Sequence, residues 1–459
     1  MNACQSRRDL VHNLAVGLCA AAVSRVASAQ PTSAQPPRPG PAATLFQNVR
    51  VFDGTSAALS VPSNVLVVGN RIERISAAAI AAPAGAAAIA GGGRTLMPGL
   101  IDAHWHSFLA TPSQSELLTA DVDYLHLVAG RTMTETLMRG FTSVRDMGGP
   151  IFGLKRAIDE QVVLGPRVWP SGAFITQTGG HFDFRQRYEV PAAPNRPLSH
   201  NERIGSAVIA DGPDAVRLRT RENLMLGASQ IKLAAGAGVS SNYDPLDVTE
   251  YTEAEIRAAV EAAENWGTYV TVHVYTPRGM QMAIRAGVKC IEHGQLADEA
   301  TAALMAERGI WWSLQPFLAD EDAIPFPAGS PNWAKELQVS RGTDTAYALA
   351  KRFRIKTAWG TDTLFSARLA TRQGEQLAKM VRWYTPAEVL KMATADNAAL
   401  LALSGPRNPY PGKLGVVEEG ALADLLLVDG NPLENIRLIE DPAKNFLVIM
   451  KDGRVYKSP

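Results

Sequence analysis

Short apolar segments alternate with helix-like segments through most of this sequence, and this alternation limits its fold more than any other feature. Eight apolar runs can be counted, and each is followed by a stretch with helical character. Strands that are connected through helices pair in parallel, so eight repeats predict an α/β fold, a (β/α)8 barrel of the TIM type. The runs are LMPGLIDAHWH, FTSVRDMG, RVWPSGAFIT, SQIKLAAGAG, TYVTVHVY, VKCIEHG, IWWSLQPF and KTAWGTD.

The clearest helix in this alternation is predicted over residues 252–266. Thr252 and Glu255 have the spacing of a capping box, in which each side chain binds the backbone of the other residue. The apolar positions recur with the period of a helix, so one face should pack on the barrel. That face would carry Ile256, Ala259, Val260 and Ala263.

The two ends of the sequence have a different pattern from the middle. Residues 44–97 and 406–459 contain short β-type runs that are separated by Asp-Gly and Gly-Asn turns. Because the same style occurs at both ends, we expect both segments to form one small β-sandwich domain. The barrel would then occupy residues 98–405.

Residues 1–29 have the pattern of an export signal. Arg7 and Arg8 precede an apolar stretch, and the small residues Ala27-Ser28-Ala29 match a cleavage site. The paired arginines suggest the twin-arginine route, with the general secretion route as the alternative. Residues 30–43 are rich in proline and predict a spacer. The mature chain would be periplasmic or secreted.

Composition excludes several classes of protein. The 459 residues contain 45 Lys+Arg and 45 Asp+Glu, so no excess of positive charge points to nucleic acid or to an anionic membrane. No apolar stretch beyond the N-terminus is long enough for a membrane span. Three cysteines, of which only Cys290 would remain after signal removal, exclude a disulfide-based fold.

Polar residues occur at the ends of runs that should be wholly apolar. Strands of a parallel barrel are buried, and active-site groups come from their carboxyl ends. His104 and His106 are two residues apart, so both imidazoles should leave the strand on the same face. The full set is His104, His106, Lys232, His273, His293 and Asp362.

This set predicts a metal centre because imidazole and carboxylate are ligands that suit Zn²⁺ and related ions. Any one of these histidines taken alone is better explained as a hydrogen-bonded core residue, and we interpret His126 and His200 in that way. A lysine in a buried strand is rare unless it is paired. The convergence of all six residues at strand ends therefore favours the metal site.

Several motifs resemble the amidohydrolase superfamily. Residues 97–106 (MPGLIDAHWH) are similar to its opening signature, and residues 420–427 (GALADLLL) to its returning β strand. The resemblance covers nearly all of residues 44–457. Residues 142–149, 179–181 and 359–362 are similar to those of a subgroup that contains Xaa-Pro dipeptidases, carboxypeptidases and imidazolonepropionase-like enzymes.

The resemblance implies a centre with two divalent metal ions, for which we expect zinc, although manganese, cobalt and iron accept the same ligands. One ion would bind His104, His106 and Asp362, and the other His273 and His293. Lys232, carboxylated by CO₂ to N6-carboxylysine, would bridge the two ions. A hydroxide shared by the ions would attack the amide carbonyl, and Asp362 would accept its proton and pass it to the departing amine.

Substrate contacts are predicted from residues near these strand ends. His181 would contact the substrate carbonyl or carboxylate, and Tyr275 would help to hold the carboxylate. Arg145 would bind substrate or form an internal salt bridge. The long connection over residues 176–212 suggests a lid. Its residues Phe182, Phe184, Arg185, Arg187 and Tyr188, with Trp311, Trp312, Phe317 and Phe326, suggest an apolar pocket with cations nearby.

The sequence therefore predicts a hydrolase of the amide bond in a dipeptide or an N-acyl amino acid with a free carboxylate. An aromatic acyl amide such as ochratoxin A would fit. The alternatives are a cyclic-amide or lactone hydrolase, a deaminase with one metal, and a non-catalytic periplasmic binding protein. The family resemblance also implies a homo-oligomer.

Overall fold

The structure is a computed structural model that describes residues 43–191 and 196–458. The predicted export signal over residues 1–29 lies outside the described residues, as does the predicted spacer apart from its last residue. Within the described ranges, no helix has both the length and the apolar character that crossing a bilayer requires.

All eight predicted apolar runs form strands of a parallel barrel, so the predicted fold class is confirmed. One sheet has the order β6-β7-β8, and the other has the order β10-β9-β11-β12-β13-β14-β15. The barrel closes between β15 and β6, where the backbone N–H of Asp362 donates to the carbonyl of His104 at 2.8 Å. The strands are β6 (Leu100–Trp105), β7 (Phe141–Asp146), β8 (Arg167–Pro170), β9 (Phe174–Thr176), β10 (Ala207–Ile209), β11 (Ile231–Ala234), β12 (Val270–Val274), β13 (Cys290–His293), β14 (Trp311–Leu314) and β15 (Thr357–Trp359).

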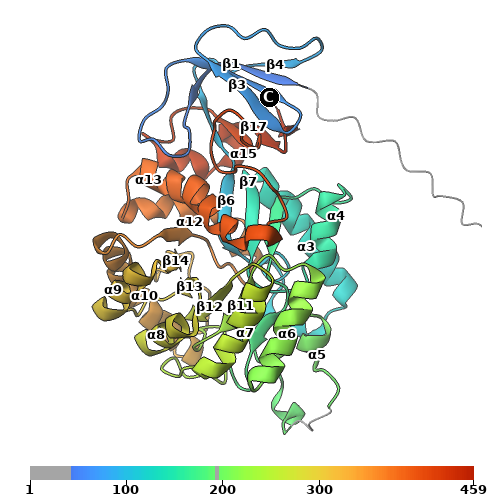
Figure 1. The fold of residues 1–459 in the computed structure, drawn as a ribbon, viewed down its shortest axis with the longest axis vertical. Coiled ribbons are helices and arrows are strands. Elements are labelled where there is room, and N and C mark those ends of the chain that lie inside the picture. The colour runs from blue at the N-terminus through green and yellow to red at the C-terminus, as the bar shows by residue number, and fades with distance from the viewer. Residues whose placement is uncertain (1–42, 192–195, 459) are drawn as a thin grey trace, which may run out of the picture. The chain divides into compact units, whose positions relative to one another are not determined.

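Helices surround these strands and follow them in chain order (Figure 1). The predicted helix over residues 252–266 is α7, which spans Glu253–Asn265 and has the expected capping box and buried face. The other long helices are α3 (Val122–Met138), α4 (Phe152–Asp159), α6 (Pro213–Leu226), α8 (Pro277–Ala286), α9 (Glu299–Arg308) and α10 (Pro331–Arg352). Shorter ones are α2 (Gln114–Thr119), α5 (His200–Arg203), α11 (Ala367–Ala370), α12 (Gln373–Ala378), α13 (Pro386–Lys391), α14 (Asn397–Leu401) and α15 (Pro442–Asn445).

The third apolar run is divided into two strands. β8 pairs with β7, and β9 pairs with β11, so the run connects the two sheets of the barrel. The break falls at Gly172, whose φ of +76° is a left-handed conformation that favours glycine. A Cβ at Gly172 would also lie 2.5 Å from Oδ1 of Asn223, so no larger residue fits there.

Strands from both ends of the chain form one β domain, drawn in blue and red in Figure 1. Its strand order is β18-β17-β16-β5-β1-β2-β3, with β4 paired to β1. A buried apolar core that includes Phe46, Val65, Leu427 and Val448 fills it. The strands are β1 (Thr44–Val51), β2 (Ser63–Val68), β3 (Arg71–Ser76), β4 (Ala87–Ala90), β5 (Thr95–Pro98), β16 (Leu425–Val428), β17 (Phe446–Lys451) and β18 (Arg454–Lys457).

The chain passes from the β domain to the barrel at Gly99, between β5 and β6. A Cβ at this position would lie 2.1 Å from Oγ1 of Thr142 in β7, so the close approach of the two parts requires glycine. The backbone N–H of Gly99 donates to the carbonyl of Asp424 at 2.8 Å. The carboxylate of Asp424 in turn accepts from Arg167 of β8 at 3.0 Å, which joins the domain to the barrel.

Candidate active site

Four of the predicted metal ligands converge at one end of the barrel. His104 lies in β6, His106 directly follows it, His293 ends β13, and Asp362 follows β15. One ligand atom from each of His104, His293 and Asp362 lies within 4.8 Å of the others. Because the carboxyl ends of parallel strands meet at one face of a barrel, residues that are far apart in the sequence form a single cluster.

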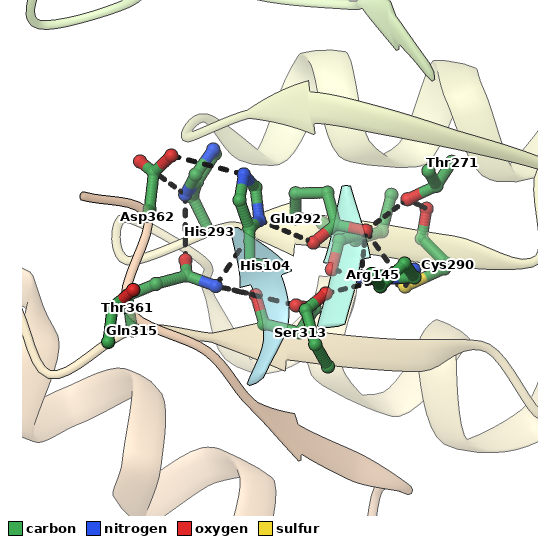
Figure 2. Close-up of polar contacts among 12 residues, drawn as sticks. His104, Arg145, Thr271, Cys290, Glu292, His293, Ser313, Gln315, Thr361 and Asp362 are labelled. Carbon is green, nitrogen blue, oxygen red and sulfur yellow. Dashed lines mark hydrogen bonds and ion pairs between the residues drawn. The ribbon is translucent and has the colours of Figure 1, made fainter. Parts of the chain in front are cut away.

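The carboxylate of Asp362 is the centre of this cluster. Its Oδ1 lies 3.1 Å from Nε2 of His104 and 3.1 Å from Nε2 of His106. Its Oδ2 lies 3.8 Å from Nδ1 of His293 (Figure 2). Burial works to raise the pKa of Asp362, but the imidazoles of His104 and His293 outweigh it and hold the pKa well below its ordinary value. The group is therefore a carboxylate, the form that binds metal or accepts a proton.

Close packing between β6 and the segment after β15 places Asp362 beside the histidines. Gly360 allows this approach, because a Cβ there would lie 2.4 Å from the backbone nitrogen of His104. Buried Asp102 joins the same two segments, since its Oδ1 accepts from the backbone N–H groups of His104 at 3.0 Å and Thr361 at 3.2 Å. Asp362 itself has a φ of +52°, a strained backbone conformation of the kind that collects at functional sites.

His273 of β12 extends the cluster to one side. Its ring centroid lies 4.4 Å from that of His293 and 4.0 Å from that of His181. Burial lowers the pKa of His273 to about 3. The imidazole is therefore neutral at physiological pH, which is the state that a metal ligand requires.

Lys232 lies in β11 with its amine buried and without a hydrogen-bond partner among the described residues. Burial lowers the pKa of this amine to about 8, although the carboxylates of Glu292 and Asp362 act in the opposite direction. A buried polar atom without a partner is rare in proteins and needs an explanation. An amine that is readily neutral, within electrostatic range of the imidazoles of His273 and His293 and of the Asp362 carboxylate, fits a metal centre with a carboxylated lysine.

Glu292 is a functional candidate that the sequence analysis missed. Its Oε2 accepts from Nδ1 of His104 at 2.8 Å, and its Oε1 accepts from Nη2 of Arg145 at 2.7 Å (Figure 2). The bond to Nδ1 leaves Nε2 of His104 facing Asp362, so Glu292 holds the imidazole in the orientation that a metal ligand at this position would need. A charged residue inside the buried run CIEH was the available signal, the same signal that identified Lys232.

Arg145 does not occupy the substrate-binding position that was predicted for it. Its guanidinium is completely buried and donates to Glu292, to the carbonyl of Ala103 at 2.6 Å and to the hydroxyl of Tyr269 at 3.2 Å. The internal salt bridge, which was the alternative prediction, is what the structure contains. The reason is that Arg145 lies within β7, with its side chain directed to the barrel interior below the histidines.

His181 lies where the prediction placed it, at the wall of a cavity that opens beside the cluster. Its backbone N–H donates to Oε1 of buried Glu250 at 2.8 Å, and its Nδ1 contacts the hydroxyl of Ser241. Gly238 makes room for the ring, because a Cβ there would lie 1.8 Å from Nδ1 of His181. Burial and the neighbouring His273 hold the pKa of His181 well below its ordinary value. His181 therefore presents a neutral ring to the cavity.

The cavity beside the cluster is also lined by His273 and Asp362. Tyr275 lines it, as predicted, with its ring 5.0 Å from that of His273. The walls are mostly apolar, and the lining includes Val239, Pro316, Phe317, Leu318, Ile324, Val339, Leu364 and Leu369.

The cations predicted near this cavity do not reach it. No lysine or arginine from the described part of the chain lines its wall. Arg185 instead pairs with Asp183 at 2.5 Å. Phe317 lines the cavity, whereas Trp312 is buried in the core and donates its indole N–H to the carbonyl of His293 at 2.6 Å. The predicted lid also has structure of its own, with α5 and β10 within residues 176–212.

Comparison with known proteins agrees with this architecture. The model of the amidohydrolase family matches residues 95–457, which include every predicted metal ligand. The chain belongs to the amidohydrolase family. It is therefore a hydrolase that acts on carbon–nitrogen bonds, in a family whose members depend on metals, and the described residues contain a cluster able to hold a metal.

The relatives of this amidohydrolase match the subgroup that the motifs predicted. An ochratoxinase of Aspergillus niger is 33% identical over 391 residues, covering 79% of this chain and 76% of the relative. A prolidase crystallised with N-methylphosphonate-L-proline is 34% identical, with a TM-score of 0.83 over 91% of this chain and 100% of the other. A Xaa-Pro dipeptidase with bound methionine is 28% identical, with a TM-score of 0.78 over 91% and 100%.

Proposed function

We propose that this amidohydrolase cleaves the amide bond of dipeptides or N-acyl amino acids with a free carboxylate, and that it does so with two divalent metal ions. The observation that carries this is the Asp362 carboxylate among imidazoles, within electrostatic range of the buried amine of Lys232, which has no hydrogen-bond partner among the described residues. The ochratoxinase and prolidase relatives support the substrate class, because each name describes an enzyme that acts on an amide bond.

The ligand chemistry divides into two sets. His104, His106 and Asp362 would hold one ion, and His273 and His293 would hold the other. Carboxylated Lys232 would supply an oxygen to each. When bound, such ions, preferably zinc, lower the pKa of water and polarise the scissile carbonyl.

Lys232 would become a ligand by reacting with CO₂. The lone pair of the neutral amine forms a nitrogen–carbon bond to CO₂, one proton leaves the nitrogen, and an anionic carbamate with two oxygens results. This reaction requires a deprotonated amine, which the lowered pKa of about 8 supports.

Asp362 would move the proton during hydrolysis. Its carboxylate would accept a proton from the attacking water and deliver it to the nitrogen of the departing amine. His181 and Tyr275 would hold the substrate carbonyl and carboxylate. Burial, with the charge of Asp362, holds the pKa of Tyr275 well above its ordinary value, so its hydroxyl stays protonated and can donate a hydrogen bond.

The N-terminal sequence supports export of this hydrolase through residues 1–29, to the periplasm or the exterior. The family resemblance supports assembly as a homo-oligomer. Size-exclusion chromatography with light scattering and fractionation of the producing cells test these two points.

The proposed function predicts that Asp362→Asn separates metal binding from turnover. Because proton transfer by a side chain contributes about 10²–10⁴-fold to rate, we expect kcat to fall by at least about a hundredfold. Metal content should remain above about half of the wild-type value, since the amide oxygen and four histidines remain. Elemental analysis and assays with a panel of dipeptides and N-acyl amino acids measure both quantities.

Asp344→Asn is the matched control for this experiment. Asp344 is exposed on α10 and pairs with Arg382 at 2.7 Å, so the same chemical change there should alter neither quantity. Near-normal kcat in Asp362→Asn would contradict the role of this carboxylate. Wild-type protein that holds no metal would contradict the metal centre itself.

A further inference from the structure

Glu336 of α10 is a half-buried carboxyl group on the wall of the cavity beside the histidine cluster, and it has no cationic partner among the described residues. Its Oε1 accepts from the backbone N–H of Ile324 at 2.8 Å. Its Oε2 has no protein partner in the same described ranges. Glu336 shares the cavity with His181, Tyr275 and Asp362, so a substrate held at the metal ligands would lie beside it.

Other acidic groups of this cavity already have positive or imidazole partners. Asp322 contacts Arg372 and lies 2.5 Å from Nζ of Lys379. Asp362 lies among the histidines. Glu336 is thus the lining carboxylate whose charge the described protein residues leave unbalanced.

The lysine that precedes Glu336 in the sequence cannot supply the missing charge. Nζ of Lys335 donates to the carbonyls of Gly238 at 3.0 Å, Ser241 at 3.0 Å and Asp244 at 2.6 Å. The ammonium group of Lys335 is therefore bound by the loop that follows β11. No lysine or arginine of the described chain lines the cavity, so the described protein offers Glu336 no ammonium or guanidinium partner there.

The apolar surroundings of Glu336 increase the stabilisation that a positively charged partner would give its carboxylate. The cavity wall near it is formed by apolar residues such as Phe317, Ile324 and Val339. Burial among them raises the pKa of Glu336 to about 7. A carboxylate in such a place is stabilised by a cation far more than one in open water.

The position of Glu336 also relates it to the scissile bond. Its charge contributes to the raised pKa of Tyr275, so the two groups lie within electrostatic range. Tyr275 is the residue to which we assign the substrate carboxylate. A group that reaches Glu336 would therefore lie in the same cavity as the carboxylate that we assign to Tyr275.

We propose that Glu336 forms a subsite for a protonated amine or guanidinium of the substrate, with apolar groups on either side of that charge. This inference rests on the proposed amide hydrolysis and specifies its substrate class. The cation has two sources, the free α-amino group of a dipeptide or a basic side chain, and both present the same N–H donors. Substrates without such a group, including aromatic N-acyl amino acids, should be the poorer class.

Two pairs of compounds that differ only by the amine test the subsite. The first pair is phenylalanyl-alanine and 3-phenylpropanoyl-alanine, which differ by the α-amino group. The second pair is 3-phenylpropanoyl-lysine and 3-phenylpropanoyl-norleucine, which differ by the side-chain ammonium. The readout is the ratio of kcat/KM within each pair, in which any loss common to both compounds cancels.

We expect the metal-loaded wild-type enzyme to prefer the amine-bearing member of one pair by about tenfold or more, since a charge-assisted hydrogen bond contributes about 1.5–3 kcal/mol. Glu336→Gln keeps the acceptor for Ile324 but removes the charge, and it should reduce that ratio about tenfold. The pair that responds identifies the source of the cation. Glu307→Gln on the exposed face of α9 is the control and should retain the preference.

Ratios near one in the wild type, or ratios that Glu336→Gln leaves unchanged, would overturn the subsite. If no compound is hydrolysed by metal-loaded wild type, the proposed function fails, and the same four compounds then serve as ligands. Their dissociation constants, measured by calorimetry on wild type and Glu336→Gln, decide the subsite separately. A tenfold preference for the amine that depends on Glu336 supports it, and equal affinities refute it.

Discussion

Two lysines are buried in the part of the chain that the structure describes, Lys232 in β11 of the barrel and Lys451 in β17 of the β domain. Burial lowers the pKa of each amine to about 8. Lys451 donates to the carbonyl of Gly165 at 2.6 Å, whereas Nζ of Lys232 has no hydrogen-bond partner among the described residues. The comparison teaches that burial does not by itself mark a reactive lysine. The missing hydrogen bond distinguishes the lysine that we propose to be carboxylated from the structural one.

The strongest way to break this comparison is to replace each lysine by methionine. Lys232→Met removes the proposed bridging group, so we expect activity to fall by about a thousandfold or more and metal content to fall from about two ions to about one. Elemental analysis and the amide-hydrolysis assay measure these changes. Wild-type activity in Lys232→Met would contradict a bridging role.

Lys451→Met is the matched control for that experiment, because it removes another buried amine from a site without candidate metal ligands. We expect its activity per folded molecule to stay within about twofold of wild type. The free energy of unfolding should fall by about 1–3 kcal/mol, because the carbonyl of Gly165 loses its donor. Thermal denaturation checks the second expectation.

The proposed reaction of Lys232 with CO₂ should depend on pH, and this dependence gives a further test of the comparison between the two lysines. With a pKa of about 8, the neutral fraction of Lys232 rises about fiftyfold from pH 6 to pH 8, so the initial rate of carboxylation should rise by about the same factor at constant dissolved CO₂. The increase has this sign because only the deprotonated amine reacts. Carbon-13 NMR of metal-free protein supplied with labelled CO₂ would follow the carbamate signal.

That signal should survive in Lys451→Met and disappear in Lys232→Met. Although the two amines share a pKa, Lys451 is held by a hydrogen bond that its reaction would break. A carbamate signal that is lost with Lys451 instead would reverse the assignment.

A smaller effect is expected from Glu292→Gln, which changes the neighbourhood of Lys232 rather than the lysine itself. Glu292 orients His104, and loss of such a partner typically weakens metal binding by about tenfold or more. Competition with a metal-sensitive dye measures the affinity, and Glu307→Gln on the surface is the control. Unchanged affinity would show that Arg145 and the barrel backbone hold His104 without this carboxylate.

The repeated pattern of the sequence was sufficient to predict the barrel. Apolar runs followed by helical periodicity identify strands wherever they occur, because burial on both faces leaves little room for polar side chains. The break in the third run was not predicted, since it depends on contact between Gly172 and Asn223, which are far apart in the chain.

The site was predictable where a polar residue ended a strand, as at His293 and Asp362. The site was harder to predict where the role of a residue depends on the direction of its side chain. Arg145 lies at the end of its run but is directed into the barrel interior, and only the packed structure shows its pairing with Glu292. Glu336 lies on α10, where a glutamate in a long helix resembles any solvated residue until the cavity beside it is known.

The mixed origin of the β domain has a consequence for how the chain is made. β5, which leads directly into the barrel, pairs with β16 along Thr95–Pro98, and β16 in turn pairs with β17. The partner of β5 is thus translated more than three hundred residues after β5 itself. Until the ribosome has delivered those last strands, one edge of β5 stays open and the domain lacks half of its core. The fold can therefore close only after the last strands have been synthesised. A truncated product that lacks β16 should expose an unpaired edge of β5, which can pair with strands of other molecules.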